Sequence, residues 1–299
     1  MNEKVLITGA TGFIGKRVLP KLIEEYGTDK IVALSSRNLE NVRTIPSNDY
    51  IFDKNYLVNN GCENVEILIH IGAFTPKNSQ VANDIQHSNS NISSTSKIIF
   101  SKLPNLKKII FTSSIDVYGS YSGIIDEGTI TVPTTLYGWS KLYCEHMLKN
   151  FETNSDIMVQ LLRIGHVYGE GEEQYKKAIP NMLRNVIAKE PIHIYGSGED
   201  LRTFIYVDDA ANAIVSSSKT NNTETINVVG NKTISINELA KSIASLCDYD
   251  VEIIHHNSNA IRRDCVFNNE KINKLLSNSY TKFDEGIAKE YEYTKRLYG

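Results

Sequence analysis

The feature that most constrains the fold is a glycine-rich turn near the N-terminus. An apolar run, Val5–Thr8, leads into Gly9, Gly12 and Gly15, and an amphipathic stretch, Lys16–Tyr26, follows them. This order predicts a strand, a tight turn and a helix. Glycines let backbone N–H groups approach a pyrophosphate, and the helix N-terminus adds partial positive charge. The segment therefore predicts a dinucleotide-binding unit at the start of the chain.

Strand-like and helix-like segments alternate through the first half of the chain. The further predicted strands are Ile31–Leu34, Tyr50–Phe52, Ile67–Ile71, Lys108–Thr112 and Val159–Ile164. Helical patterns at 91–103 and 137–151 lie between them. Alternation of this kind, with strands that are apolar on both faces, predicts an α/β fold of the Rossmann type. Its core is expected to be a doubly wound parallel sheet with helices on both faces.

The pattern loosens after residue 164. The predicted elements there are a helix at Ile179–Ala188, a strand at Thr225–Val229, a helix at Ile236–Cys247 and a polar helix at the end. We predict a dinucleotide-binding domain over residues 1–164, with return segments around 200–230. Residues 165–299 are expected to form a smaller substrate-binding lobe that is not cleanly separated from it. Such a lobe would cover the carboxyl ends of the strands, where open α/β sheets bind ligands.

The composition argues against several kinds of partner. A net charge of −3 gives no basic footprint for nucleic acid, and no apolar run approaches the ~18–20 residues that cross a membrane. The N-terminus enters a strand-like run directly, without a secretory signal, so we expect a cytoplasmic protein. Cys62, Cys144, Cys247 and Cys265 lack metal-type spacing. We therefore expect free thiols and no metal site.

Four motifs resemble those of the extended short-chain dehydrogenase/reductases, the family of nucleotide-sugar epimerases, dehydratases and reductases. Residues 8–15 read T-G-A-T-G-F-I-G, and residues 111–119 read F-T-S-S-I-D-V-Y-G. Residues 137–141 read Y-G-W-S-K, and residues 196–209 read G-S-G-E-D-L-R-T-F-I-Y-V-D-D. The resemblance covers nearly the whole chain. It implies a nicotinamide cofactor and a nucleotide-diphosphate sugar as substrate.

Tyr137 and Lys141 are the predicted catalytic pair. Four residues apart on a helix, they lie on one face, one turn apart. A nearby ammonium favours the phenolate. Lowering the tyrosine pKa by about 3 units requires about 4 kcal/mol, which Lys141 and a positive nicotinamide could supply. By resemblance, Ser114 at the end of the fifth strand segment hydrogen-bonds the substrate oxygen and shares the proton transfer. Ser113 is expected on the cofactor side.

The choice of nicotinamide cofactor depends on the end of the second predicted strand. An acid about 20 residues after the glycine turn hydrogen-bonds the ribose of NAD, but Ser35 stands there, and Arg37 follows. Arginine can bind a 2′-phosphate, so we predict NADP(H), with NAD(H) as the alternative. By resemblance, Asp53 contacts adenine. The full predicted cofactor set is Gly9, Thr11, Gly12, Phe13, Ile14, Gly15, Arg37, Asp53, Gly72, Ala73, Asn91, Ser113, Tyr137 and Lys141.

The predicted substrate contacts come from the resemblance. His166 stands where an Asn of the family contacts the diphosphate, and Glu170 replaces a Pro. Arg202 matches a diphosphate-binding position, and either Arg262 or Arg263 matches a second one. An arginine fork fits phosphate oxygens. With the pocket residues, the predicted substrate set is Phe74, Thr75, Ser114, His166, Arg202, Arg262 and Arg263.

Three reactions of the family remain to be separated. Ile115 replaces the acid of an Asp–Glu pair that dehydratases need, and Asp116 alone keeps its place, which disfavours a dehydratase. We expect an NADPH-dependent reductase of a nucleotide-activated 4-keto-6-deoxy sugar, in deoxysugar or lipopolysaccharide O-antigen synthesis. The alternative is a nucleotide-sugar 4-epimerase with tightly bound NAD.

Other classes of function share parts of this pattern. A redox-sensing NADP-binding protein without catalysis would be expected to lose Tyr137 or Lys141, and both are present. A reductase of small carbonyl compounds would share the Tyr–Lys pair but bind no nucleoside diphosphate. The predicted helices at 91–103 and 137–151 match those that pair across a dimer in the family. We therefore expect a homodimer, by resemblance only.

Overall fold

A seven-stranded parallel sheet lies at the centre of the computed structural model, which describes residues 4–47, 55–72, 74–121, 123–259, 262–277 and 279–299. Its strands are β1 (Lys4–Thr8), β2 (Ile31–Ser35), β3 (Arg43–Pro46), β4 (Val65–His70), β5 (Lys108–Ser114), β7 (Met158–Ile164) and β11 (Thr225–Val228). Their order in space is β11-β7-β5-β4-β1-β2-β3, and every neighbouring pair is parallel. All seven residues of β5 are buried, as expected of a strand covered on both faces.

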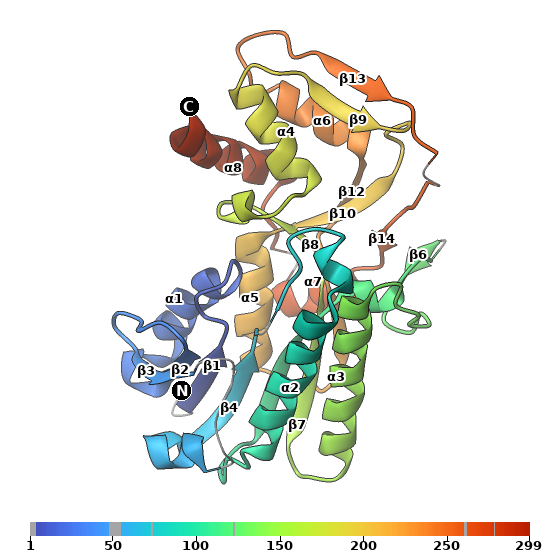
Figure 1. Cartoon of the computed structure of the whole chain (residues 1–299). Coiled ribbons are helices and arrows are strands. Elements are labelled where there is room, and N and C mark those ends of the chain that lie inside the picture. The colour runs from blue at the N-terminus through green and yellow to red at the C-terminus, as the bar shows by residue number, and fades with distance from the viewer. Residues whose placement is uncertain (1–3, 48–54, 73, 122, 260–261, 278) are drawn as a thin grey trace.

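Helices pack on both faces of this sheet (Figure 1). They are α1 (Gly15–Tyr26) and α5 (Val207–Ser218) on one face, and α2 (Ile85–Phe100) and α3 (Leu136–Thr153) on the other. Val18 of α1 belongs to one core cluster with Ile7, whereas Leu148 of α3 belongs to a second cluster with Leu6. Neighbouring residues of β1 thus face opposite cores. The predicted Rossmann-type α/β fold is confirmed.

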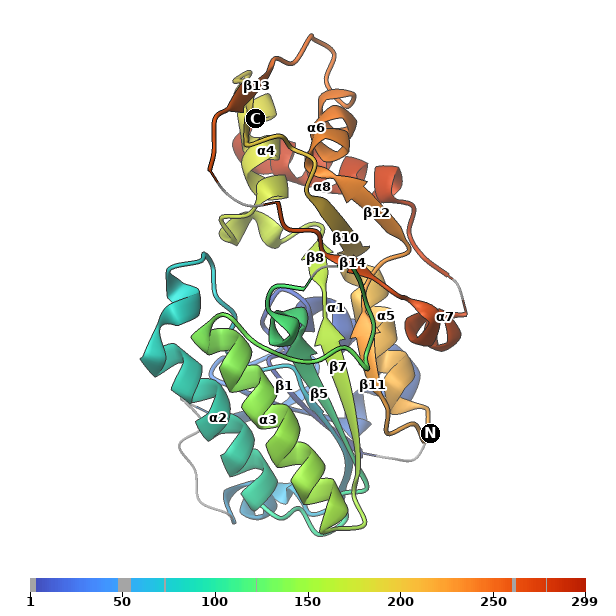
Figure 2. The same cartoon turned by 90° about the vertical axis from the view of Figure 1, so that its right-hand side faces the viewer.

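A second group of elements lies beyond the carboxyl ends of the central strands (Figures 1 and 2). Its sheets are β8 (His166–Tyr168), β10 (Leu201–Tyr206) and β12 (Lys232–Ser235), and β9 (Ile192–Tyr195) with β13 (Ile253–His256). Its helices are α4 (Ala178–Ile187), α6 (Ile236–Ala244) and α8 (Phe283–Tyr298). Later in the chain, β11 joins the central sheet and α5 packs on it. The predicted domain boundaries and return segments both stay predictions.

Smaller elements complete the described chain. The short strands β6 (Ile124–Ile125) and β14 (Val266–Phe267) pair with each other. The remaining helix is α7 (Glu270–Leu276), and the short helical turns are η1 (Thr28–Lys30), η2 (Val58–Cys62), η3 (Val81–Asn83), η4 (Ile115–Tyr118) and η5 (Glu172–Gln174). Among the helices of the described residues, none is long and apolar enough to span a membrane.

Two elements differ from the sequence-based expectation. β3 is the edge strand of the sheet at Arg43–Pro46. Its single buried residue, Ile45, leaves no apolar run to detect, and a proline is tolerated only at an edge. The strand predicted at Tyr50–Phe52 lies outside the described residues. α2 begins at Ile85 rather than near residue 91, because the Asp84 carboxylate accepts a hydrogen bond from the His87 N–H and caps the helix.

Candidate active site

The glycine turn joins β1 to α1 by a close approach of backbone. Gly9 has φ +72°, and a Cβ built on it would lie 2.7 Å from the Gly72 nitrogen. A Cβ on Gly15 would lie 2.0 Å from the Gly9 oxygen, so α1 can begin here only with glycine. The N-terminus of α1 has no side-chain cap among the described residues and no acid in its first turn. Its polar backbone is therefore suited to bind an anion.

The predicted catalytic residues meet at the carboxyl end of β5. Tyr137 and Lys141 lie in the first turns of α3 and are only 5% and 3% exposed. The Tyr137 hydroxyl hydrogen-bonds the side chains of Ser114 and Thr75. The Lys141 ammonium donates to the Thr112 carbonyl at 3.0 Å. A phenol, an ammonium and a strand-end hydroxyl thus converge from two elements that lie far apart in sequence.

Electrostatics at Tyr137 differ from the expectation drawn from the sequence. Burial raises the pKa of Tyr137, the negative charge of Asp116 raises it further, and the hydrogen bonds from Ser114 and Thr75 oppose the shift. Burial also lowers the pKa of Lys141 to about 8. The protein's own groups therefore keep the phenol protonated at neutral pH. The lowering expected from Lys141 would need the further positive charge of an oxidised nicotinamide.

A buried network fixes α3 against the turn that follows Ser114. The Arg163 guanidinium of β7 donates from Nη2 to Glu145 of α3 at 2.7 Å, and from Nη1 to the Tyr118 hydroxyl of η4 at 2.7 Å. Tyr118 in turn donates to the Asn227 side chain at 2.8 Å. Both side chains of the ion pair are less than 10% exposed. This network holds the segment that carries Tyr137 against the segment that carries Ser114.

The region between the carboxyl end of β5 and the second group of elements, where Tyr137, Asp116 and His166 lie, is called the cleft below. Positive groups gather on its side nearest the second group of elements. Burial lowers the pKa of His166 to about 3, and the charges of Arg202, Lys177 and Arg263 lower it further. Burial raises the pKa of Asp116, which the charges of Arg263 and Lys177 oppose. Three cations, an acid and a neutral imidazole therefore share this side of the site. The His166 Nδ1 atom is buried and has no partner among the described residues.

The sequence belongs to a known family. Residues 5–230 match the NAD dependent epimerase/dehydratase family. The chain is a member of that family. The resemblance drawn from the motifs is thus confirmed. The protein is an enzyme of the nucleotide-sugar epimerase/dehydratase family.

Individual relatives differ in their reactions. A putative UDP-glucose 4-epimerase from Methanocaldococcus jannaschii is 32% identical over 247 residues, covering 79% of this chain and 79% of the relative. A dTDP-D-glucose 4,6-dehydratase from Dictyostelium discoideum is 28% identical over 239 residues, covering 71% of this chain and 54% of the relative. The chain thus matches about half the length of that dehydratase.

The fold also matches solved structures of the family. A UDP-N-acetylglucosamine 4-epimerase from Methanobrevibacter ruminantium, in complex with UDP-N-acetylmuramic acid, superposes with a TM-score of 0.85 at 26% identity. The superposition covers 99% of both chains. The glycine turn of this chain and its Tyr137–Lys141 pair on α3 therefore lie in a fold that, in this relative, binds a nucleotide sugar.

The structure separates the two candidate arginines. Arg262 lies at the surface, 52% exposed, and its Nε atom is 3.0 Å from Asp264. Arg263 instead donates to the Gly119 carbonyl beside η4, and its own carbonyl accepts from Arg202. Arg263 and Arg202 therefore approach the cleft together. The two arginines thus have different surroundings, and which of them contacts the substrate stays a prediction.

The remaining predicted residues have varied surroundings. Phe74 packs edge-on against Tyr137, with ring centroids 6.2 Å apart. Asn91 is buried, and its amide accepts from the Phe74 N–H and donates to Ser140. The Ser113 hydroxyl is buried without a partner among the described residues. Arg37 is exposed beyond β2, with its N–H on the Ser35 hydroxyl. Asp53 and Ala73 lie outside the described residues.

The sequence did not single out Lys177 or a nearby cavity of about 490 Å³. Lys177 precedes α4 with only Lys176 beside it, and nothing in that context marks a site. The cavity opens next to Arg202, and its polar lining includes Asn181, His193 and Asp200. These residues come from α4, β9 and the segment before β10, so only the fold brings them together.

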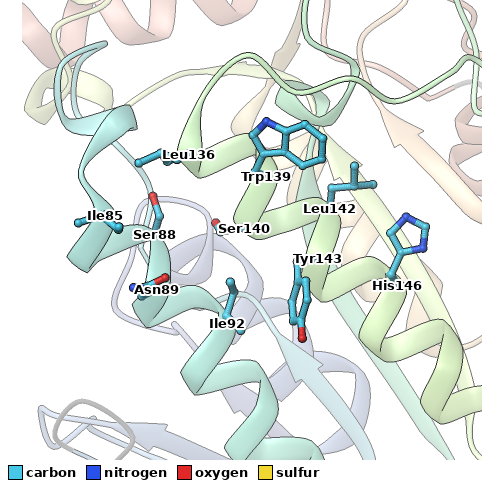
Figure 3. Close-up of a pocket in the computed structure, with 10 residues that line it drawn as sticks. All are labelled: Ile85, Ser88, Asn89, Ile92, Leu136, Trp139, Ser140, Leu142, Tyr143 and His146. Atoms are coloured by element: carbon cyan, nitrogen blue, oxygen red, sulfur yellow. The ribbon is translucent and has the colours of Figure 1, made fainter.

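A separate apolar hollow lies between α2 and α3, on the outer face of the helices (Figure 3). Trp139 and Tyr143 of α3 are 51% and 57% exposed there, and Ile85 of α2 is 63% exposed. In the same helix, Tyr137 and Lys141 face inward. The outer face is therefore unusually apolar for a surface and carries none of the predicted catalytic side chains.

Proposed function

We propose that the protein transfers a hydride between a nicotinamide dinucleotide and C4 of a nucleotide-diphosphate sugar. The observation that carries this proposal is the meeting of Tyr137, Ser114 and Lys141 at the end of β5. When bound beside them, the nicotinamide supplies or accepts the hydride. The chain's own residues then hold the C4 oxygen and move its proton.

Each member of the trio has one task in the reduction of a C4 ketone. Tyr137 donates its hydroxyl proton to the C4 oxygen as the new C–H bond forms. The Ser114 oxygen accepts from the Asp116 N–H at 3.2 Å. Its own hydrogen, which is directed to Tyr137 in this structure, would donate to the same C4 oxygen once the sugar is bound. The Lys141 ammonium would stabilise the phenolate that Tyr137 becomes and would hold the nicotinamide ribose when the dinucleotide is bound.

We place a 4-keto reductase that uses NADPH first among the reactions. Burial keeps Tyr137 protonated at neutral pH, which suits a proton donor rather than a base. Arg37 is exposed and forms no ion pair with any residue in the described part of the chain, so its guanidinium is available to a 2′-phosphate. The substrate proposed for this reaction is a nucleotide-activated 4-keto-6-deoxy sugar.

A 4-epimerase with tightly bound NAD is the second candidate, and the named relatives favour it. Both the Methanocaldococcus relative and the Methanobrevibacter structure carry a 4-epimerase name. An epimerase would use the same trio twice to move the proton of the C4 oxygen: once when NAD⁺ takes the hydride from C4, and once when NADH returns it to the other face. Oxidation needs Tyr137 as a phenolate, which the positive charge of oxidised nicotinamide favours.

The substrate diphosphate would lie on the positive side of the cleft. Arg202 and Arg263 are proposed to bind its oxygens, and Lys177 adds a third charge. The unpartnered Nδ1 of His166 can donate one hydrogen bond there in the appropriate tautomer. The neighbouring cavity beside Arg202 is proposed to take the nucleoside.

The test is an assay with two readouts on the same protein. NADPH is mixed with UDP- and dTDP-linked 4-keto-6-deoxyhexoses, and loss of its absorbance is followed while the sugars are separated by chromatography. Net oxidation of NADPH supports the reductase. Interconversion of UDP-hexoses at C4, without net change of the dinucleotide, would establish the epimerase. If neither reaction occurs and neither dinucleotide binds, the proposal is wrong.

We also propose that the chain forms a homodimer through the apolar hollow between α2 and α3 (Figure 3). A second copy on this face would bury Trp139, Tyr143 and Ile85 against their equivalents, as a two-fold interface requires. Sedimentation of wild type and of Trp139→Glu tests this. A monomeric wild type at micromolar concentration would contradict it.

A further inference from the structure

The segment between β8 and α4, residues 169–177, passes beside the glycine turn. The Tyr175 ring centroid lies 5.9 Å from that of Phe13. A Cβ built on Gly171 would lie 3.3 Å from the Phe13 ring. The Lys176 N–H donates to the Lys77 carbonyl at 3.0 Å. The segment therefore contacts both the turn that precedes α1 and the loop that follows β4.

Glu170 fastens this segment to α1. Its Oε2 atom accepts from the Tyr206 hydroxyl at 2.6 Å and lies 3.3 Å from Nη2 of Arg17, in the first turn of α1. The same Nη2 atom donates to the Glu170 carbonyl at 3.3 Å. The Arg17 and Glu170 side chains are 33% and 19% exposed. Partial burial makes such a charge-assisted cluster stronger than an exposed ion pair.

Nearby carboxylates balance the positive charge of Arg17. Besides Glu170, the Asp208 carboxylate lies 3.9 Å from Arg17 Nε. Two carboxylates face one guanidinium, so Arg17 adds little net positive charge to the turn. Glu170 thus influences the turn through the position of the segment and not by repelling or attracting a phosphate. It stands where the family pattern has a proline, which could form none of these side-chain contacts.

We propose that Glu170 is a positioning residue that slows the release of the bound dinucleotide. The inference rests on the proposed function, because it takes the glycine turn as the seat of the pyrophosphate. A pyrophosphate on that turn would lie beside segment 169–177, which contacts Phe13 of the turn, and we take separation of the two as the step that releases it. Separation breaks the contacts of Glu170 with Arg17 and Tyr206. The dissociation rate of the dinucleotide therefore depends on this cluster.

The experiment measures release directly and needs no sugar substrate. The whole protein is saturated with NADPH and mixed with excess NADP⁺, and the loss of bound-NADPH fluorescence gives the dissociation rate. Glu170→Gln and Arg17→Gln are each expected to raise this rate about tenfold, the change that one charge-assisted hydrogen bond accounts for. The double variant should be no faster than either single variant, because both break one cluster.

Matched controls separate the cluster from general effects on α1. Glu25, also on α1, pairs with Lys219 at 2.9 Å and with comparable exposure, so Glu25→Gln should release NADPH at the wild-type rate. Arg17→Lys keeps a cation and should release it more slowly than Arg17→Gln. Tyr206→Phe removes only the donated hydrogen bond and should give a smaller increase. Thermal unfolding of every variant checks that each is folded.

The outcomes distinguish the inference from the function on which it rests. Folded Glu170→Gln with an unchanged dissociation rate overturns the inference and leaves the proposed function standing. A faster rate in Arg17→Gln alone also overturns it, since Arg17 would then act on the ligand by itself. A wild-type protein that binds neither NADPH nor NADH overturns the proposed function.

Discussion

The two sides of the cleft are built in different ways. The side proposed to bind the dinucleotide, here called the dinucleotide side, is formed by the backbone of one continuous turn, where Gly9 and Gly15 allow contacts that no side chain would permit. The side proposed to bind the substrate, here called the substrate side, is formed by side chains from segments far apart in sequence, such as Asp116, Lys177 and Arg263. One side therefore depends on local shape, and the other on charges that only the complete fold brings together.

Replacing Tyr137 by Phe should have the largest effect, because it acts where the two sides meet. Loss of the proton donor is expected to lower kcat by about a thousandfold, within the range for general acid catalysis. Dinucleotide affinity should stay close to that of the wild type. Steady-state turnover and fluorescence titration measure the two. Full retention of function in Tyr137→Phe would instead point to a redox-sensing protein.

Gly15→Ala tests whether the dinucleotide side is defined by backbone shape. Its Cβ would lie 2.0 Å from the Gly9 oxygen, and overpacking of this kind is expected to lower the free energy of unfolding by about 3 kcal/mol. Gly12→Ala is the matched control, because its Cβ would lie 3.3 Å from the same oxygen. Denaturant unfolding should show a much smaller loss for Gly12→Ala. Equal losses would contradict the account.

On the substrate side, Arg202 and Arg263 should matter for binding of the nucleotide sugar, whereas Arg262 should not. Arg202→Gln and Arg263→Gln are each expected to raise the KM for the nucleotide sugar by roughly thirtyfold, because each loses charge-assisted bonds to phosphate. Arg262→Gln should change it little, since Arg262 pairs with Asp264 at the surface. Initial rates over a range of sugar concentrations decide this. An Arg262→Gln effect as large as that of Arg263→Gln would remove the distinction.

The pH dependence should reflect Lys141. Its pKa is lowered to about 8 by burial, and a lysine loses its charge above its pKa. The value of kcat/KM, which reports the free enzyme, is therefore expected to fall as pH rises through about 8. Between about 8 and 10.5 the unfolded chain binds this proton better, so this lysine makes the folded state more stable as pH rises. A profile that stays flat above pH 8 would contradict the assignment.

The smallest effect is expected at Arg37, which is exposed beyond β2. Arg37→Gln should weaken NADPH binding by about tenfold and leave NADH binding nearly unchanged, because only NADPH carries the 2′-phosphate. Titration with each dinucleotide gives the ratio. If both dinucleotides bind Arg37→Gln as they bind the wild type, the cofactor preference does not come from this residue.

The difference between local shape and long-range contacts explains which parts of the fold and of the site could be predicted from the sequence. The glycine turn and the spacing of Tyr137 and Lys141 are local patterns, so their place on β1–α1 and on α3 could be predicted. The association of Ser114 with them needed only the strand-end motif. These predictions depend on neighbours within a few residues, which a single sequence displays directly.

The remainder depended on contacts between distant segments. Lys177 reaches the cleft because α4 follows β8 across the carboxyl ends of the strands, and no local pattern marks it. Arg262 and Arg263 are adjacent in sequence, and only the contact with Gly119 separates their positions. β3 was missed because an edge strand with one buried residue has no apolar run.

The central claim is that hydride moves between the nicotinamide and C4 of a nucleotide sugar beside Tyr137. Its most direct test uses NADPH that carries deuterium on C4 of the nicotinamide ring, in the position that is transferred, together with a nucleotide-linked 4-keto-6-deoxyhexose. The product sugar is then analysed by mass spectrometry and NMR. The account predicts one deuteron at C4 of the sugar for each NADPH oxidised, with almost no transfer by Tyr137→Phe. Oxidation of NADPH without deuterium in the sugar, or transfer by Tyr137→Phe at the wild-type rate, would contradict it.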